Sequence, residues 1–173
     1  DLICVSGDLG AAYMGLQLLE REKNVFAGER DFTPAFEGRE YILERQLKPE
    51  ARKDIIDELA KHHIVPTAMM DISDGLASDI RHIMERSGVG AAIDTERIPA
   101  AADADIRTAA CAGEDYVLLL TADCADAERL AADFLARFGA PLHPVGRITD
   151  GRELEWFENG TLRPLDWHGF THY

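Results

Sequence analysis

The sequence predicts an α/β (α+β) layered domain in which helices flank a mixed β-sheet. Short apolar runs typical of strands alternate with longer segments of helical periodicity, and two short runs near the C-terminus are joined by Asn159-Gly160. Asn-Gly favours the tight turn that joins antiparallel strands. The 173 residues, 46% of them hydrophobic, suffice for one core. We therefore expect a single domain over residues 1–173.

The first half of the chain alternates strands and helices, and it includes one long polar connection. In order, we expect a strand over 2–6, a helix from Leu9 to about Asn24, a connection over 26–40, a helix with Pro49 in its first turn, and a new element from Pro66 onward. Proline suits a first helical turn because its missing N–H has no intrahelical partner there. Ile55, Ile56 and Leu59 of that helix should face the core, and 61–63 should form its C-terminal end.

The second half continues this alternation. We expect a strand that ends before Ser73, a helix directly after Gly75, strands over 91–94 and 116–121, a helix over 125–138 closed by Gly139, a strand over 145–148, and a hairpin of 154–157 with 161–163. In the helix after Gly75 the spacing places Leu76, Ile80, Ile83 and Met84 inward, and Ser78, Asp79, Arg81 and Glu85 toward water.

Charge and composition exclude several classes of function. A formal charge of −14 would repel nucleic-acid phosphates and anionic membranes. Apolar runs fall far short of the ~18 residues that span a bilayer, and no signal segment opens the chain, so we expect a cytoplasmic protein. The three cysteines and six histidines lack the spacing of a disulfide framework or a zinc site, so we assign none of them to catalysis.

Ser73-Asp74-Gly75 stands where an apolar run ends and a helical pattern begins. The usual use of such a triplet is a helix cap, in which the Asp side chain accepts an N–H of the first turn. A carboxylate at a strand-to-helix junction can also carry chemistry. A second acidic motif, Gly113-Glu114-Asp115-Tyr116, precedes another apolar run, and two carboxylates there are hard to explain as solvated surface.

The two motifs together, in this order, resemble the C-terminal half of the thiamine-monophosphate kinase family, which belongs to the aminoimidazole ribonucleotide synthetase superfamily. The segment 3–12 resembles the strand, turn and helix that open that half, and 167–173 resembles the aromatic tail of the family. The resemblance implies a missing N-terminal ATP-binding domain. The chain begins inside an expected strand and without Met, so we expect a fragment that is inactive alone.

The resemblance implies transfer of a phosphoryl group from ATP to thiamine monophosphate, giving thiamine diphosphate and ADP. The acceptor is already an anion, so repulsion is the main obstacle: two unit charges ~4 Å apart cost ~4 kcal/mol at an effective dielectric of ~20. Mg²⁺ held by carboxylates is the natural remedy. By resemblance, Asp74 is a metal ligand and catalytic residue, and Ser73 beside it contacts phosphate or a metal-bound water.

The remaining site residues also follow from the resemblance, each beside a structural alternative. Glu114 and Asp115 would serve the thiamine phosphate side, one near the cationic rings and the other holding the loop. The aromatic tail would stack on those rings or pack as a hydrophobic end, and its residues are Trp167, Phe170 and Tyr173. Gly7 and Asp8 would approach a phosphate at the next helix N-terminus, or form a plain turn.

The chain departs from the family pattern at two positions and in one length. Ala112 stands where a second Gly is usual, Val117 stands where Glu is usual, and the segment between Pro99 and Gly113 is shorter than expected. One alternative is another ATP-dependent member of the superfamily, such as a selenophosphate synthetase. A second alternative is a non-catalytic acidic domain that binds a metal or a partner. As a full-length kinase the protein should be a homodimer.

Overall fold

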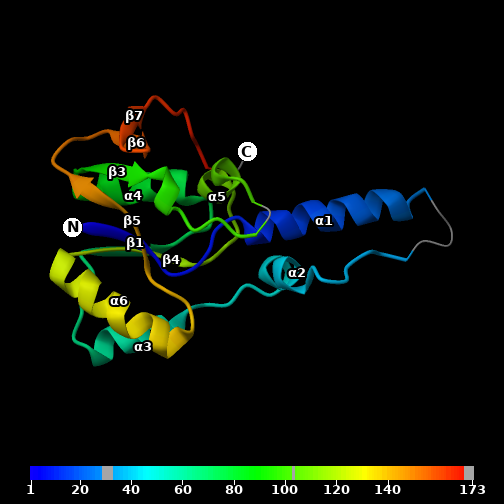
Figure 1. Ribbon diagram of the computed structural model, residues 1–173, viewed down its shortest axis with the longest axis horizontal. Coiled ribbons are helices and arrows are strands. Elements are labelled where there is room, and N and C mark those ends of the chain that lie inside the picture. The colour runs from blue at the N-terminus through cyan, green and yellow to red at the C-terminus, as the bar shows by residue number, and fades with distance from the viewer. Residues whose placement is uncertain (29–32, 103, 170–173) are drawn as a thin grey trace.

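A mixed β-sheet forms the centre of the molecule (Figure 1). The computed structural model describes residues 1–28, 33–102 and 104–169. Within these residues the sheet has seven strands in the order β2-β4-β1-β5-β3-β6-β7. The strands are β1 Leu2–Val5, β2 Ala68–Asp71, β3 Gly90–Asp94, β4 Leu118–Ala122, β5 His143–Thr149, β6 Leu154–Glu158 and β7 Thr161–Arg163. Only β3 and β6 pair in parallel among these strands, which confirms the mixed sheet.

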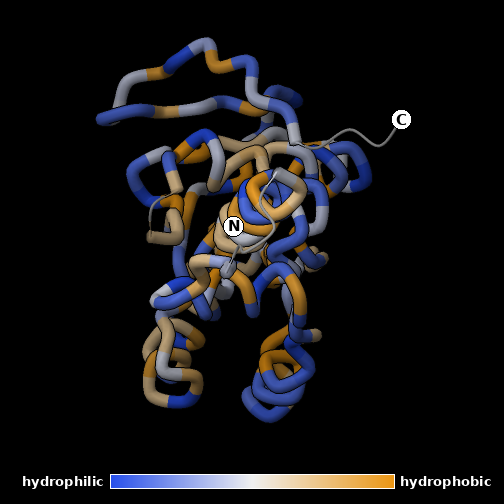
Figure 2. Tube along the Cα trace, turned by 90° about the vertical axis from the view of Figure 1, so that its right-hand side faces the viewer, coloured by the Kyte–Doolittle hydropathy of each residue, from blue (hydrophilic) through white to orange (hydrophobic). Residues whose placement is uncertain are grey.

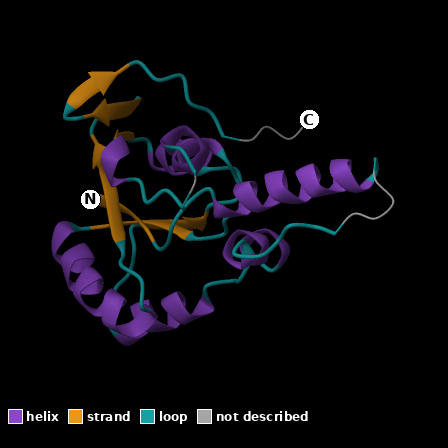
Figure 3. Cartoon of the chain, turned by 45° about the vertical axis from the view of Figure 1, so that its right-hand side comes forward, coloured by secondary structure: helices purple, strands orange, loops and turns teal. Residues whose placement is uncertain are grey.

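Helices lie on both faces of the sheet, and one pair extends beyond it. They are α1 Ala11–Phe26, α2 Glu40–Leu47, α3 Lys53–Lys61, α4 Leu76–Ser87, α5 Ile106–Cys111 and α6 Cys124–Phe138. Helices α4 and α5 lie on one face, and α3 and α6 lie on the other (Figure 1). Helix α1 projects away from the sheet with α2 alongside it (Figure 3). None of the described helices combines the length and the apolar character of a membrane span.

The two faces of the sheet bury two separate sets of side chains, because successive strand residues point to opposite faces. In β1, Ile3 and Val5 pack with α4, whereas Cys4 packs with α3 and α6. Figure 2 shows the hydrophobic parts of the trace mainly toward the middle of the molecule and the hydrophilic parts on outer helices and loops. The alternation along β1 therefore gives each helical layer its own core.

Several predicted elements are confirmed. Helix α6 ends at Gly139, which adopts the left-handed conformation with φ 68°. Strands β6 and β7 form the expected hairpin, and both turn residues have positive φ, 49° at Asn159 and 70° at Gly160. These values fit the tight turn that Asn-Gly favours. Local turn chemistry was sufficient to predict both features.

Other predictions were wrong or incomplete. Helix α3 begins at Lys53, so Pro49 lies in the preceding loop and not in a first turn, and Ile56 is exposed. Helices α2 and α5 were not predicted, because both are short and α2 has no buried residue. Strand β4 begins at Leu118 and not at Tyr116, since Tyr116 has a φ of 52° that no strand accommodates.

A buried carboxylate joins α3 to α6. Glu58 is only 4% exposed, and its side chain contacts Lys61 at 3.1 Å, the imidazole of His62 at 2.9 Å and Arg137 of α6 at 3.1 Å. The hydrogen bond from Lys61 lowers the pKa of Glu58 most, and the bond to His62 and the nearby cations act in the same direction. A carboxyl group with a lowered pKa stabilises the folded state only while it is ionised.

The variant Glu58→Gln is expected to lower the Tm at neutral pH by a few degrees. The ionised form of Glu58 is favoured by folding, so its contribution is complete above the ordinary pKa of 4.5 and is lost as the pH falls through the lowered value. The Tm difference between wild type and variant, measured by calorimetry, should therefore shrink below about pH 4.5. Asp57→Asn is the control, because its pair with Lys53 is exposed. A Tm difference that does not change with acid would contradict this account.

Candidate functional site

The loop between β2 and α4 carries Ser73, Asp74 and Gly75 and lies along the acidic segment that precedes β4. Ile72 donates its N–H to the carbonyl oxygen of Val117 and accepts from the N–H of Tyr116, at 2.8 and 2.9 Å. The N–H of Glu114 donates to the carbonyl oxygen of Ser73 at 2.9 Å. The two motifs singled out in the sequence are therefore bound to each other by backbone hydrogen bonds.

Glycine residues allow this close packing around Asp74. A Cβ on Gly113 would lie 2.1 Å from the carbonyl oxygen of Ser73, and one on Gly169 would lie 2.1 Å from that of Asp74. Neither distance leaves room for a side chain, so any other residue would displace the backbone. Three segments far apart in the sequence, 73–75, 111–114 and 167–169, thus converge at Asp74.

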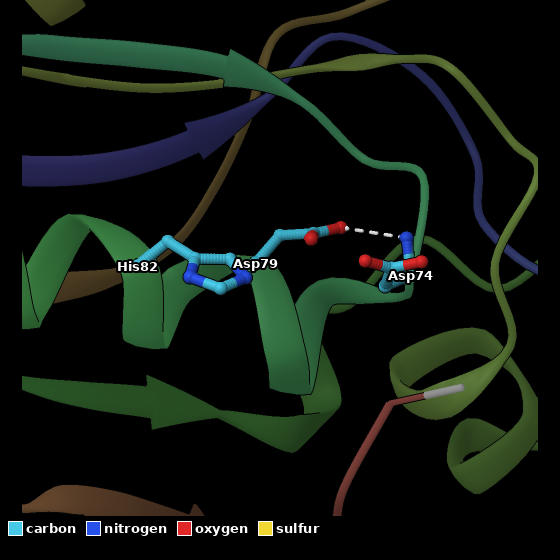
Figure 4. Close-up of side chains that lie close together, drawn as sticks. All are labelled: Asp74, Asp79 and His82. Atoms are coloured by element: carbon cyan, nitrogen blue, oxygen red, sulfur yellow. Dashed lines mark hydrogen bonds between the residues drawn. The ribbon is translucent and has the colours of Figure 1, made fainter. Parts of the chain in front are cut away.

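Asp79 occupies the interior of this site, which contradicts the prediction that it faces water. Asp79 is 1% exposed. One of its carboxylate oxygens, Oδ2, accepts the N–H groups of Ser73 and Asp74 at 3.0 and 3.1 Å. Burial raises the pKa of Asp79 to about 6, and the charge of Asp74 also raises it. Figure 4 shows the Asp79 carboxylate reaching toward the Asp74 loop.

Asp74 itself is not the N-cap residue of α4. That position belongs to Gly75, whose carbonyl oxygen accepts the N–H groups of Ser78 and Asp79, both at 2.9 Å. Asp74 lies one residue earlier and is partly exposed.

Asp74, Asp79 and His82 bring their ligand atoms within 4.8 Å of one another (Figure 4). The second oxygen of Asp79, Oδ1, is buried and has no hydrogen-bond partner among the described residues. Two carboxylates suit the preference of Mg²⁺ for oxygen, whereas an imidazole nitrogen is more typical of transition metals. The carboxylate of Asp74 fits the Mg²⁺ that the sequence analysis expects, whereas Oδ2 of Asp79 is already bound by two N–H groups.

Asp115 binds the start of α1 and is completely buried. Its two oxygens accept the N–H of Gly10 at 2.7 Å and that of Ala12 at 3.2 Å, while Arg45 donates to the Asp115 carbonyl oxygen at 2.7 Å. Burial raises the pKa of Asp115 to about 6. The sequence analysis expected one of the two adjacent acids to lie near the cationic rings and the other to hold the loop. The contacts of Asp115 are those of an acid that holds the loop.

The arrangement at α1 contradicts the phosphate prediction for Gly7 and Asp8. The helix N-terminus that would bind phosphate already binds the Asp115 carboxylate, and a second anion there would be repelled. The Asp8 carboxylate accepts the hydroxyl of Tyr41. Gly7 lies against the side chain of Val117. The segment is therefore the plain turn that was the alternative.

Glu114 is the exposed acid of the pair. Its φ of 70° turns it away from the strand direction, and its side chain accepts the hydroxyl of Tyr116 at 3.0 Å. It lies beside the Asp74 loop, because its N–H donates to Ser73. Glu114 is thus the acid of this motif that a ligand can reach.

The described part of the aromatic tail, residues 167–169, lies against α4. Trp167 is half-buried, packs against the core, and has its ring centroid 5.0 Å from that of Trp156. A guanidinium nitrogen of Arg81 lies 3.5 Å from the Trp167 carbonyl oxygen. In this structure Trp167 packs against the hydrophobic core, as in the alternative in which the tail is a hydrophobic end. Phe170 and Tyr173 lie outside the described residues.

Sequence reasoning missed three residues that the structure brings to the site. Asp79 was assigned to the solvent side of α4 and His82 was given no role, although their spacing of three places them on one helix face. Arg45 belongs to α2, a helix that was not predicted. The helical spacing was the available signal for the first two, and no sequence signal pointed to Arg45.

The comparisons with known proteins agree on one family. The family described as "AIR synthase related protein, C-terminal domain" matches residues 1–157. The chain is 32% identical to the thiamine-monophosphate kinase of Salmonella typhimurium strain LT2, over 100% of this chain and 52% of that protein. The chain therefore spans about half the length of the curated relatives that it matches over its whole length.

Solved structures give the same match. The thiamine-monophosphate kinase of Stenotrophomonas maltophilia K279a has a TM-score of 0.74 at 28% identity, covering 94% of this chain and 51% of that one. A structure described as "AaThiL complexed with AMPPCP and TMP" has a TM-score of 0.71 at 29% identity, covering 100% and 51% of the two chains.

Proposed function

The chain belongs to the AIR synthase related proteins as a C-terminal domain of that family, and from this premise we propose that it is the C-terminal half of a thiamine-monophosphate kinase. The observation that carries the proposal is the convergence of the Ser-Asp-Gly loop, the Gly-Glu-Asp-Tyr loop and the tail at Asp74. Similarity to thiamine-monophosphate kinases along the whole chain supports it.

The proposed reaction moves the γ-phosphoryl group of ATP to a phosphate oxygen of thiamine monophosphate. The bond between the γ-phosphorus and the bridging oxygen breaks, a new phosphorus–oxygen bond forms, and ADP leaves with the electron pair. The nucleophile is already ionised at neutral pH, so no residue of the chain needs to remove a proton from it. The relative solved with AMPPCP, an ATP analogue, and TMP supports this pair of substrates.

The chain would contribute part of the metal and phosphate environment. Asp74 would hold Mg²⁺, with Ser73 next to it contacting phosphate or a water on the metal. When bound, Mg²⁺ offsets the repulsion between the phosphate anions. Asp79 would keep the loop in place through the two amide hydrogen bonds. None of these residues acts as a general base in this proposal.

The substrate side would be formed by Glu114 and the tail. The exposed carboxylate of Glu114 can attract the positively charged thiamine ring system beside the Asp74 loop. Trp167, which is partly exposed, would contact the same rings, and Phe170 and Tyr173 are proposed as further substrate-binding residues. The role of Asp115 is to hold the loop that presents Glu114.

We further propose that the complete protein has an N-terminal domain that binds ATP and supplies the remaining metal ligands. The coverage of about half of the relatives that match the whole chain supports this division. The full-length protein would be a homodimer in the cytoplasm, where ATP is available. The domain alone is expected to show no turnover, because it contains one side of the site only.

The experiment is an assay of the full-length protein with ATP, Mg²⁺ and thiamine monophosphate. We expect thiamine diphosphate and ADP in equal amounts, and no product when Mg²⁺ is chelated. ATP consumption only with selenide in place of thiamine monophosphate would instead assign a selenophosphate synthetase. A full-length protein that consumes ATP with neither acceptor would contradict the proposed function.

A further inference from the structure

We propose that Asp79 is a positioning residue for the phosphoryl transfer: it binds the amides of Ser73 and Asp74 and thereby fixes the direction of the Asp74 carboxylate. The inference rests on the proposed function. It assigns a role in the site to Asp79, a residue that the sequence pattern places on the solvent side of α4. Asp79 is 1% exposed, and its role would be exerted through Asp74 and not by contact with substrate.

The contact is made by one oxygen of the side chain. Oδ2 of Asp79 accepts the N–H groups of two consecutive residues, Ser73 at 3.0 Å and Asp74 at 3.1 Å. Two N–H groups that point to one acceptor determine the orientation of the peptide between them. That peptide leads directly into Cα of Asp74, so the hydrogen bonds restrict where its carboxylate can point.

Two other segments contact the carbonyl side of the loop. The carbonyl oxygen of Ser73 is bound by the N–H of Glu114, and the carbonyl oxygen of Asp74 lies against Gly169. These contacts fix the carbonyl side of the loop, whereas Asp79 binds the amide side. Removal of the Asp79 carboxylate would leave both N–H groups without this acceptor, and the loop would rearrange to recover hydrogen bonds.

The position of Asp79 in α4 explains how a helical residue can do this. It is the fourth residue of the helix, which begins at Leu76, and side chains in a helix point back toward the N-terminus. An anion there is also favoured by the positive end of the helix dipole. Because Oδ1 has no hydrogen-bond partner among the described residues, an amide nitrogen could replace it without breaking a hydrogen bond described here.

The test compares Asp79→Asn with Asp79→Ala in the full-length protein. Asparagine retains an oxygen that can accept both N–H groups, and alanine does not. We expect the alanine variant to lose about tenfold or more in kcat and to need a higher Mg²⁺ concentration for half-maximal rate. The KM for thiamine monophosphate should change less than kcat. The asparagine variant should remain within about threefold of wild type in all three quantities.

Hydrogen exchange provides a second readout that does not depend on turnover. Deuterium uptake by peptides covering 70–76 should become faster in Asp79→Ala and remain slow in Asp79→Asn. The matched control is Asp123→Ala, which removes the N-cap carboxylate of α6, an exposed group bound to the N–H of Asp126 at 2.9 Å. This control can lower the Tm, but it should leave the Mg²⁺ dependence and the exchange of 70–76 unchanged.

Three outcomes would overturn the inference. An alanine variant with normal kcat and Mg²⁺ dependence would show that Asp79 only stabilises the fold. An asparagine variant as impaired as alanine would assign the function to the negative charge, as in direct metal binding. If the alanine variant does not fold, faster exchange of 70–76 in the asparagine variant would contradict the proposal. Absence of turnover in wild type would instead contradict the proposed function, and the exchange comparison would still decide the role of Asp79.

Discussion

Asp74→Asn in the full-length protein is expected to reduce Mg²⁺-dependent turnover by about 100-fold or more, with the fold retained. A metal ion that neutralises phosphate charge is worth several kcal/mol in the transition state, and each ~1.4 kcal/mol is a factor of ten in rate. Asparagine has the size of aspartate and retains one oxygen, so the change removes mainly the charge. The measurement is the rate of ADP release as a function of Mg²⁺ concentration.

The control for this variant is Asp150→Asn, which removes one negative charge from an exposed position next to β5. It should have normal kcat and normal Mg²⁺ dependence. Near-normal activity of Asp74→Asn at saturating Mg²⁺ would mean that Asp74 serves only the structure of the loop. A large loss of Tm in this variant would also assign the Asp74 side chain a structural role, because the backbone N–H groups of Ser73 and Asp74 that donate to Asp79 are unchanged by the substitution.

Asp115→Ala is expected to lower the free energy of unfolding by about 2–5 kcal/mol, because it leaves the buried N–H groups of Gly10 and Ala12 without an acceptor. Each unsatisfied buried group costs about 1–3 kcal/mol. Asp115→Asn should be intermediate, since it retains one of the two oxygens. Urea unfolding followed by circular dichroism measures the difference, and a loss below about 1 kcal/mol would contradict this role for the carboxylate.

The pH dependence of the Asp115 effect has a definite sign. Burial raises the pKa of Asp115 from 3.8 to about 6, so the folded state binds the proton more tightly than the unfolded state does. The contribution of Asp115 to stability is therefore greatest at acidic pH and falls as the pH rises from about 4 to about 6. The difference between wild type and Asp115→Ala should decrease over this range. An increase with pH would mean that the folded protein favours the ionised carboxylate.

The elements that were predicted correctly depend on local signals. The turn at Asn159-Gly160 and the end of α6 at Gly139 follow from the backbone angles that these residues adopt readily. The place of Asp74 at a junction of strand and helix followed from hydrophobic periodicity. Helix α2 was missed because its stability comes from its contacts with α1, as at Gly15, where a Cβ would lie 2.1 Å from the Ile42 carbonyl oxygen.

The two acids of the Gly-Glu-Asp-Tyr motif show where sequence reasoning stopped. Glu114 and Asp115 are neighbours with the same chemistry, and nothing in their order indicates which of them is buried. The left-handed φ of Glu114, 70°, helps to place one acid at the surface and the other, completely buried, against the start of α1. That conformation depends on the backbone hydrogen bonds to Ser73 and Ile72, which are far away in the sequence.

The amino-acid sequence by itself determined the α/β class, the strand-to-helix junction at Asp74 and the family resemblance, because these features depend on local periodicity and short motifs. Only the tertiary structure decided that Asp79 is buried beneath the Asp74 loop, that Asp115 binds α1, and that Gly169 lies against Asp74. Helical periodicity places Asp79 on the polar face of α4. In the first turn of this helix, however, Asp79 is buried against the loop that carries Ser73 and Asp74. Burial there is compensated by two amide hydrogen bonds that exist only after the chain has folded.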